Sequence, residues 1–216
     1  MDRRRFLGLA GTAGAGLTTL LGCRGQQVGE VMKDNKKDLV GNTAAGAETY
    51  KPMIDDALAK LLTRQNAGLQ PASTPAPPPG KKSICFVGLE NKSSEALGDF
   101  KDQIVEIIDT KINTSQVFVS ISRKSVEAVL ASQRLAPKDL FIPENQRKFI
   151  AVMESQGMPF DYLLFATTTS GTTQSTSATQ KDYLLSLELI DIRTGMSDKE
   201  LSAPIRKAYS RSHFAR

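Results

Sequence analysis

The sequence is poor in the residue types on which most catalytic and metal-binding sites depend. Its 216 residues include no tryptophan, two cysteines and one histidine, His213, which lies three residues before the end. Zinc sites need clusters of cysteine and histidine, and a Ser–His–Asp triad needs a fixed imidazole. No serine has a lysine three positions later, so the Ser-x-x-Lys pair of penicilloyl-serine enzymes is also missing. We therefore predict a protein without enzymatic activity, catalytic residues, a metal or a cofactor.

The excess of basic charge is small once the N-terminus is set aside. The chain has 28 Lys and Arg against 23 Asp and Glu, a net charge of +5, and residues 1–22 hold three arginines and one aspartate. The remaining residues carry +3, without a lysine or arginine stripe. Binding to nucleic acid phosphates needs a concentrated basic surface, so the sequence argues against a nucleic acid partner.

Residues 1–22 have the pattern of an export signal. Arg3 and Arg4, one further residue, and then Phe6 and Leu7 match the twin-arginine motif. The apolar stretch from Phe6 onward is 16 residues long and is interrupted by four glycines. A membrane-spanning helix needs about 20 apolar residues, so this stretch is typical of the central region of a signal peptide.

The signal ends in Leu20-Leu21-Gly22-Cys23, which resembles the lipobox of bacterial lipoproteins. Leu20 stands three residues before the cysteine and Gly22 is the small residue at the cleavage site, whereas Leu21 is bulkier than usual. Cleavage after Gly22 makes Cys23 the first residue and the acceptor of a lipid, whose buried methylenes hold a domain at a membrane surface. Arg24 follows rather than aspartate, which favours the outer membrane, facing the periplasm. The alternative is an ordinary signal peptide in which Cys23 has no role.

Acylation of Cys23 leaves Cys85 without a disulfide partner in an oxidising, exported location. Cys85 lies between Ile84 and Phe86, so we predict that it is a small, buried hydrophobic residue. The alternative is a reactive thiol in a redox or small-ligand-binding domain.

Composition divides the chain after the signal peptide into five segments. A stretch without apolar periodicity follows Cys23 and, fully extended, reaches about 80 Å. An apolar stripe at helical spacing comes next, and then five prolines within ten residues. The predicted segments are a flexible tether at 23–46, an amphipathic helix at 47–65, a proline-rich spacer at 66–82, an α/β domain at 83–210 and a tail at 211–216.

Apolar strands alternate with amphipathic helices within residues 83–210. Strands are predicted at 83–89, 116–121, 162–168 and 183–189, with a last edge strand at 200–209 that contains Pro204. The Ser/Thr-rich residues 169–181 are typical of an exposed hairpin connection, and Arg193-Thr194-Gly195 is typical of a turn. Strand–helix–strand order favours parallel pairing. The predicted fold class is α/β, a small mixed sheet of four to five strands flanked by helices.

Several segments together resemble the penicillin-binding protein activator LpoB family. They are "YKPMIDDALAKLL", "ICFVGLENKSSE", "FVSISRKSVEAVL", "FDYLLFATTTSG" and "LLSLELIDIRTG". The resemblance covers roughly 47–64 and 83–209. It implies an outer-membrane lipoprotein with a small α/β domain, similar to the TolB N-terminal domain, that binds a peptidoglycan synthase (penicillin-binding protein) and stimulates it without an active site of its own. The loops that would hold the interface do not match, so the resemblance does not identify the residues that contact the partner.

A second family offers an alternative function. Secretion and envelope assembly lipoproteins of the CsgG type share the α/β core and the lipid anchor, but they use two long amphipathic hairpins. This chain has one candidate hairpin, residues 162–192, with a polar tip.

Overall fold

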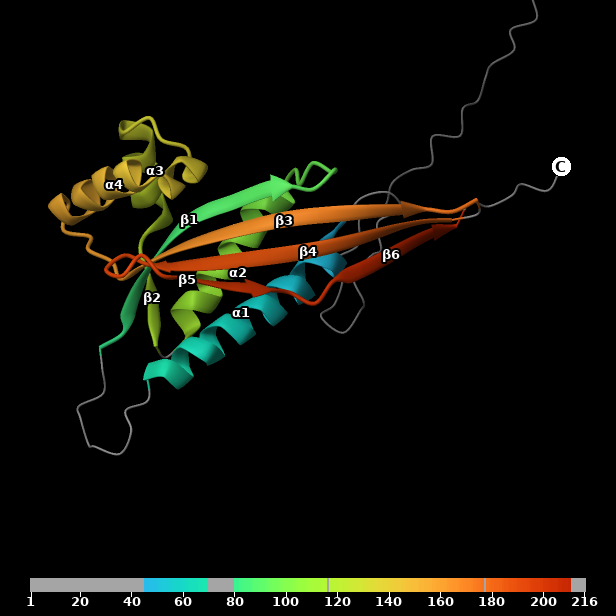
Figure 1. Ribbon diagram of the computed structural model, residues 1–216, viewed down its shortest axis with the longest axis horizontal. Coiled ribbons are helices and arrows are strands. Elements are labelled where there is room, and N and C mark those ends of the chain that lie inside the picture. The colour runs from blue at the N-terminus through green and yellow to red at the C-terminus, as the bar shows by residue number, and fades with distance from the viewer. Residues whose placement is uncertain (1–44, 70–79, 116, 177, 211–216) are drawn as a thin grey trace, which may run out of the picture. The chain divides into compact units, whose positions relative to one another are not determined.

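A mixed sheet with helices on both faces forms the core of the described residues, 45–69, 80–115, 117–176 and 178–210, in the computed structural model (Figure 1). The strands are β1 (Lys82–Lys92), β2 (Phe118–Ser120), β3 (Tyr162–Gln174), β4 (Ala178–Asp191), β5 (Ser197–Leu201) and β6 (Ile205–Ser210). The helices are α1 (Ala47–Leu69), α2 (Phe100–Thr114), α3 (Arg123–Ser132), the 3-10 helix η1 (Pro137–Phe141) and α4 (Pro143–Ser155). The strand order is β2-β1-β3-β4-β5, and β6 also pairs with β4. The α/β class is confirmed, with six strands where four to five were predicted.

The apolar strand predicted at 83–89 is β1, at the centre of the parallel half of the sheet. β1 pairs in parallel with β2 and with β3, as the alternation of strands and helices predicts. Ile84 and Phe86 pack in the core with α1 and α2, whereas Cys85 and Val87 pack in the core with α3 and α4. Because both faces are buried, the strand is a continuous apolar run rather than an alternating one.

β3 and β4 form a long antiparallel hairpin. Its register runs from Tyr162 opposite Asp191 to Gln174 opposite Thr179. The strands therefore include most of residues 169–181, where the Ser/Thr-rich composition predicts an exposed connection. The hairpin and its exposure at 171–176 are confirmed. The connection is shorter than predicted, because threonine is β-branched and suits a strand once neighbours supply hydrogen bonds. β6 provides the second neighbour of β4 in this region.

The region predicted as a last edge strand, 200–209, is divided at Pro204. β5 ends before Pro204 and β6 begins after it, and both pair antiparallel with β4. Proline cannot donate to a strand ladder, so the ladder is interrupted there. The turn predicted at 193–195 joins β4 to β5, and the Asp191 carboxylate accepts hydrogen bonds from its first two N–H groups at 2.8 and 2.9 Å.

Helix α1 packs on the same face of the sheet as α2. It contacts α2, β4 and β5, and it continues to Leu69, past the predicted boundary at 65. The stripe predicted from helical spacing is buried at Tyr50, Met53, Ile54, Ala57, Leu58 and Leu61. Its last member, Leu62, is only partly buried. The opposite face is covered by α3, η1 and α4, which gather at one end of the sheet (Figure 1). We call this layer, residues 123–155, the helical cap.

Candidate partner interface

Cys85 is fully buried between the sheet and the helical cap, with 0% of its surface exposed. Burial raises the pKa of its thiol to about 12, so the reactive thiolate is scarce at neutral pH. This burial confirms the predicted small hydrophobic residue and argues against the redox alternative. Among the described residues, no group of three or more His, Cys, Asp or Glu side chains is placed to hold a metal ion.

Four charged side chains meet near the start of α1, and we call them the junction cluster: Glu48, Glu95, Lys181 and Lys207. Lys181 of β4 and Lys207 of β6 are direct cross-strand partners, so two like charges face one another. Each lysine is neutralised by a glutamate from another element: Glu48 in the first turn of α1 accepts from Lys207 at 2.8 Å, and Glu95 in the β1–α2 loop pairs with Lys181. The cluster therefore ties α1 and this loop to β4 and β6.

Glu95 also holds the start of the described chain. Its carboxylate accepts hydrogen bonds from the Ala45 N–H and from the Tyr183 hydroxyl, each at 2.8 Å. Burial alone would raise the pKa of Glu95, but the hydrogen bonds from Lys181, Ala45 and Tyr183 outweigh it and lower the pKa. Glu95 is thus ionised at neutral pH. The junction cluster therefore fixes Ala45 and the first turn of α1 against β4 and β6.

A cleft of about 300 Å³ lies between α2, α3 and the carboxyl-terminal half of β1, with Gly88, Lys101 and Arg123 among its lining residues. Clefts at the carboxyl ends of parallel strands bind ligands in many α/β proteins. Here the Arg123 guanidinium already donates to Glu127 at 2.7 Å and to Asp102 at 3.2 Å. Arg123 is partly buried and already has its carboxylates, and Lys101 is exposed, so neither cation points to a ligand in the cleft.

Beside the helical cap, the sheet face becomes polar. In the row nearest the cap, Phe165, Glu188 and Lys199 lie side by side on β3, β4 and β5. The next row consists of Thr167, Ser186 and Leu201. These side chains range from half-buried to exposed, except Phe165, which is buried. We call these two rows the open face.

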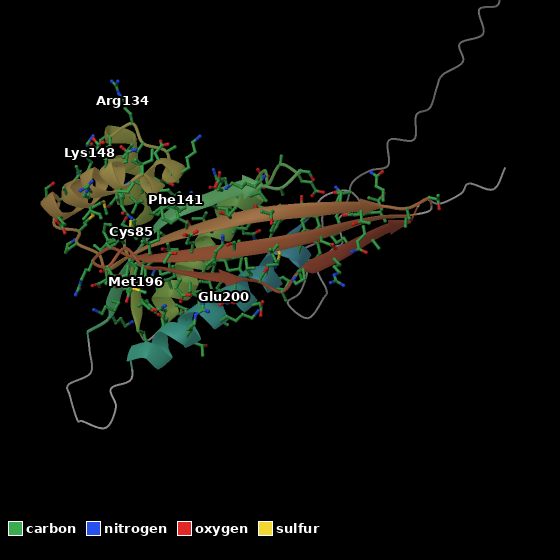
Figure 2. The ribbon with its side chains drawn as sticks, in the orientation of Figure 1. Cys85, Arg134, Phe141, Lys148, Met196 and Glu200 are labelled. Carbon is green, nitrogen blue, oxygen red and sulfur yellow. The ribbon has the colours of Figure 1, made fainter. Side chains whose placement is uncertain are left out.

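Two consecutive apolar residues project where the helical cap meets the open face, and we call Phe141 and Ile142 the apolar shoulder. Their surfaces are 49% and 53% exposed. The Phe141 ring stacks on Phe165, with centroids 4.3 Å apart and an interplanar angle of 28°, and Figure 2 shows it at this boundary. Adjacent large apolar residues held in solvent are typical of a protein-binding surface.

The apolar shoulder is held rigidly by its surroundings. η1 begins with Pro137 and α4 begins with Pro143, so prolines restrict the chain on both sides. The Asp139 carboxylate accepts the Ala136 N–H at 2.8 Å, and the Asn145 side chain donates to the Asp139 carbonyl at 3.2 Å. The local backbone thus keeps the shoulder in place, which reduces the entropy lost on binding.

The site residues that the sequence predicts lie outside the described residues. They are the lipidation residue Cys23, the export signal residues Arg3, Arg4, Phe6 and Leu7, and the cleavage residues Leu20 and Gly22. These assignments stay predictions. Within the described residues, no helix is both long and apolar enough to cross a membrane.

Sequence reasoning missed both the apolar shoulder and the junction cluster. The available signal for the shoulder is the pair Phe141-Ile142 between Pro137 and Pro143, since prolines at such spacing interrupt a regular apolar stripe. For the junction cluster no sequence signal exists, because its members are far apart in the chain and only the sheet brings them together.

Comparison with known proteins finds likeness in solved structures only. No protein-family model matches the sequence, and no curated protein is significantly similar to it. The chain is similar to the LpoB C-terminal domain from Salmonella enterica, at 16% identity and a TM-score of 0.42, over 73% of this chain and 98% of that one. The LpoB C-terminal domain from Escherichia coli gives 14% identity and a TM-score of 0.42, over 69% and 98% of the two chains.

A third similar structure is the lipoprotein GNA1162 from Neisseria meningitidis, at 20% identity and a TM-score of 0.41, over 59% of this chain and 83% of that one. At these levels of identity and TM-score, the likenesses establish neither a family nor a function for this chain.

Proposed function

We propose that this chain is an outer-membrane lipoprotein, anchored through an acylated Cys23 and facing the periplasm, that binds and activates a peptidoglycan synthase of the penicillin-binding protein class. It has no catalytic role of its own in this proposal. The export motif at Arg3, Arg4, Phe6 and Leu7 and the lipobox at Leu20-Leu21-Gly22-Cys23 support the location. The segments that resemble the LpoB family support the partner.

The observation that carries the proposal is the apolar shoulder. Phe141 and Ile142 are about half exposed, are rigidly held, and lie next to the open face rather than beside a cluster of reactive groups. Such a surface binds another protein through apolar anchors surrounded by polar contacts. A lipid anchor adds a high effective concentration near a partner in the same envelope, so a small interface suffices.

The test is binding and stimulation of the bifunctional synthase from the same bacterium. A soluble form that begins at Arg24 is added to the purified synthase, and glycan polymerisation from lipid-linked precursor is measured with and without it. We expect co-purification and a faster polymerisation rate. If the native sequence neither binds the synthase nor stimulates it, the proposal is contradicted.

Matched variants connect the effect to the shoulder. Ile142→Asp places a charge on the shoulder and should abolish stimulation. Met196→Asp is the control, because Met196 is 73% exposed on the β4–β5 turn, outside the shoulder and the two rows of the open face. Equal loss in both variants would mean that general surface apolarity, rather than the shoulder, mediates binding.

The anchor and the alternative function have separate tests. Intact-mass measurement or palmitate labelling of the exported chain, compared with Cys23→Ala, tests acylation. Light scattering tests the CsgG-like alternative, which expects an oligomeric ring, whereas the proposed activator needs none.

A further inference from the structure

Arg134 occupies a helix-terminal position that favours glycine. α3 ends in a Schellman motif, in which the Leu135 N–H donates to the Leu130 carbonyl at 2.9 Å and the Arg134 N–H donates to the Ala131 carbonyl at 3.1 Å. The motif requires a left-handed residue, and Arg134 has a φ of 54°. Arginine is disfavoured there because its Cβ crowds the backbone. Its side chain is exposed at the outer end of the helical cap (Figure 2).

Ile142 occupies a second helix-terminal position of the helical cap that favours another residue type. It is the N-cap of α4, since its carbonyl accepts the Gln146 N–H at 3.0 Å, and its side chain makes no capping hydrogen bond. Serine, threonine, aspartate or asparagine would cap the helix and stabilise it. Isoleucine provides no cap and leaves its side chain 53% exposed. Local rules are broken in this way mainly where a function needs the side chain.

The helical cap also carries an excess of positive charge. Residues 123–155 contain six basic and four acidic side chains. Arg123 pairs with Asp102 and Glu127, and Lys148 pairs with Glu144. The remaining basic side chains of the cap are all exposed: Lys124, Arg134, Lys138 and Arg147. None of these four forms an ion pair with a carboxylate of the described residues.

Two of these cations flank the apolar shoulder. Lys138 precedes Phe141 by three residues in η1, and side chains at this spacing in a 3-10 helix lie over one another. The Arg147 Nε donates to the Pro143 carbonyl at 3.2 Å, which places its guanidinium next to the residue that follows Ile142. Glu144 lies in the first turn of α4, pairs with Lys148 and also interacts with Arg147. Basic side chains outnumber it, so the shoulder has a rim with a positive excess, the arrangement of an interface with an apolar centre and a charged border.

We infer that the helical cap docks onto an acidic protein surface with an apolar recess, in which Phe141 and Ile142 fill the recess and Lys138, Arg147 and Arg134 face carboxylates. This rests on the proposed function only in taking the synthase as the partner. Charge complementarity selects an acidic partner over a neutral one. A fixed shoulder of two residues fits a protein recess better than a lipid surface, which offers no shape to match.

The experiment measures association kinetics with the immobilised periplasmic region of the synthase, using the soluble form that begins at Arg24. Salt is raised from about 50 to about 500 mM, which shortens the range of charge interactions several-fold. We expect the on-rate of the wild type to fall by about 10-fold or more. Lys138→Gln with Arg147→Gln should lower the on-rate at low salt and weaken its salt dependence. Arg206→Gln, the same charge change on exposed β6, is the control and should leave both unchanged.

Arg134→Gly separates binding from folding. Glycine relieves the left-handed backbone, so this variant should unfold at a higher temperature while its on-rate falls several-fold at low salt. Arg134→Lys keeps the charge and should restore most of the on-rate. A purely structural role for Arg134 would leave the on-rate of Arg134→Gly unchanged, which would overturn its place in the inference.

The outcomes distinguish this inference from the proposed function. Binding that is insensitive to salt and to Lys138→Gln with Arg147→Gln would overturn the acidic partner surface and leave the synthase proposal intact. If the synthase does not bind at all, the proposed function fails, and poly-L-glutamate becomes the probe. Salt-dependent binding to poly-L-glutamate that Lys138→Gln with Arg147→Gln weakens supports the inference. Absence of such binding overturns the inference. Binding to phosphatidylglycerol vesicles that is tighter than binding to the synthase would also overturn the inference. Self-association of the wild type that is lost in Ile142→Asp would overturn it as well.

Discussion

Replacing Ile142 with aspartate should improve the fold and damage binding at the same time. Ile142 is the N-cap of α4 and makes no side-chain capping bond. An aspartate there gains about 1 kcal/mol by capping. Its negative charge at the positive end of the helix adds about 0.3–1 kcal/mol.

The lost isoleucine side chain opposes this gain. Fully burying such a side chain contributes about 1.5–3 kcal/mol, and Ile142 is 53% exposed, so its removal costs about 1 kcal/mol. The net effect lies between no change and about 1 kcal/mol of stabilisation. For a chain of this size, that corresponds to a rise in melting temperature of zero to about 4 °C.

Binding should change in the opposite direction. A central apolar anchor of an interface contributes about 2 kcal/mol or more, so affinity for the synthase should fall by about 30-fold. Thermal unfolding by circular dichroism and calorimetric titration measure the two effects. Ile142→Ala is the control, because it removes the apolar side chain without adding a cap and should lower both quantities. A melting temperature reduced by more than about 4 °C, or an unchanged affinity, would refute the reasoning.

Three further predictions follow from described contacts. Arg134→Gly should raise the free energy of unfolding by about 1 kcal/mol, measured by urea denaturation, because it removes a left-handed strain. Native Cys85 should resist maleimide and react in urea, and rapid native labelling would contradict its burial. Glu95→Gln should destabilise the fold by about 1–3 kcal/mol. Glu48 and Glu95 have lowered pKa values in the folded state, so their contribution to stability is complete above the ordinary glutamate pKa and is lost as pH falls through the folded pKa values. Glu95→Gln should therefore reduce the loss of unfolding free energy at acid pH. An unchanged dependence of unfolding free energy on pH would count against the cluster.

Strands and helices with a strong apolar period could be predicted from the sequence, because their burial is a local property of the pattern. β4 is the clearest case, where Tyr183, Leu185 and Leu187 alternate with less buried residues and are themselves buried. β5 could not be predicted, since its sequence, SDKEL, has no apolar alternation. It forms because β4 offers an unpaired edge, and that is a property of the assembled sheet.

The candidate interface could be predicted only in part. Phe141 and Ile142 are visible in the sequence as two apolar residues between prolines, but the sequence does not show whether such residues are exposed or buried. Their exposure follows from where η1 ends relative to β3, which depends on the stacking of Phe141 on Phe165, 24 residues later. The sequence likewise predicts only an ordinary exposed charge at Arg134, because its left-handed backbone is visible only in the structure.

The two ends of the sheet differ in how well their residues suit the local structure. Near the start of α1, Glu95 accepts the Ala45 N–H, and Lys181 ties Glu95 to β4, so charged and backbone hydrogen bonds support the fold there. In the helical cap, Arg134 and Ile142 depart from the residues that would best stabilise their helices. Local rules are broken mainly where a side chain is needed for function, and this is why the proposed partner interface is placed on the cap rather than at the junction cluster.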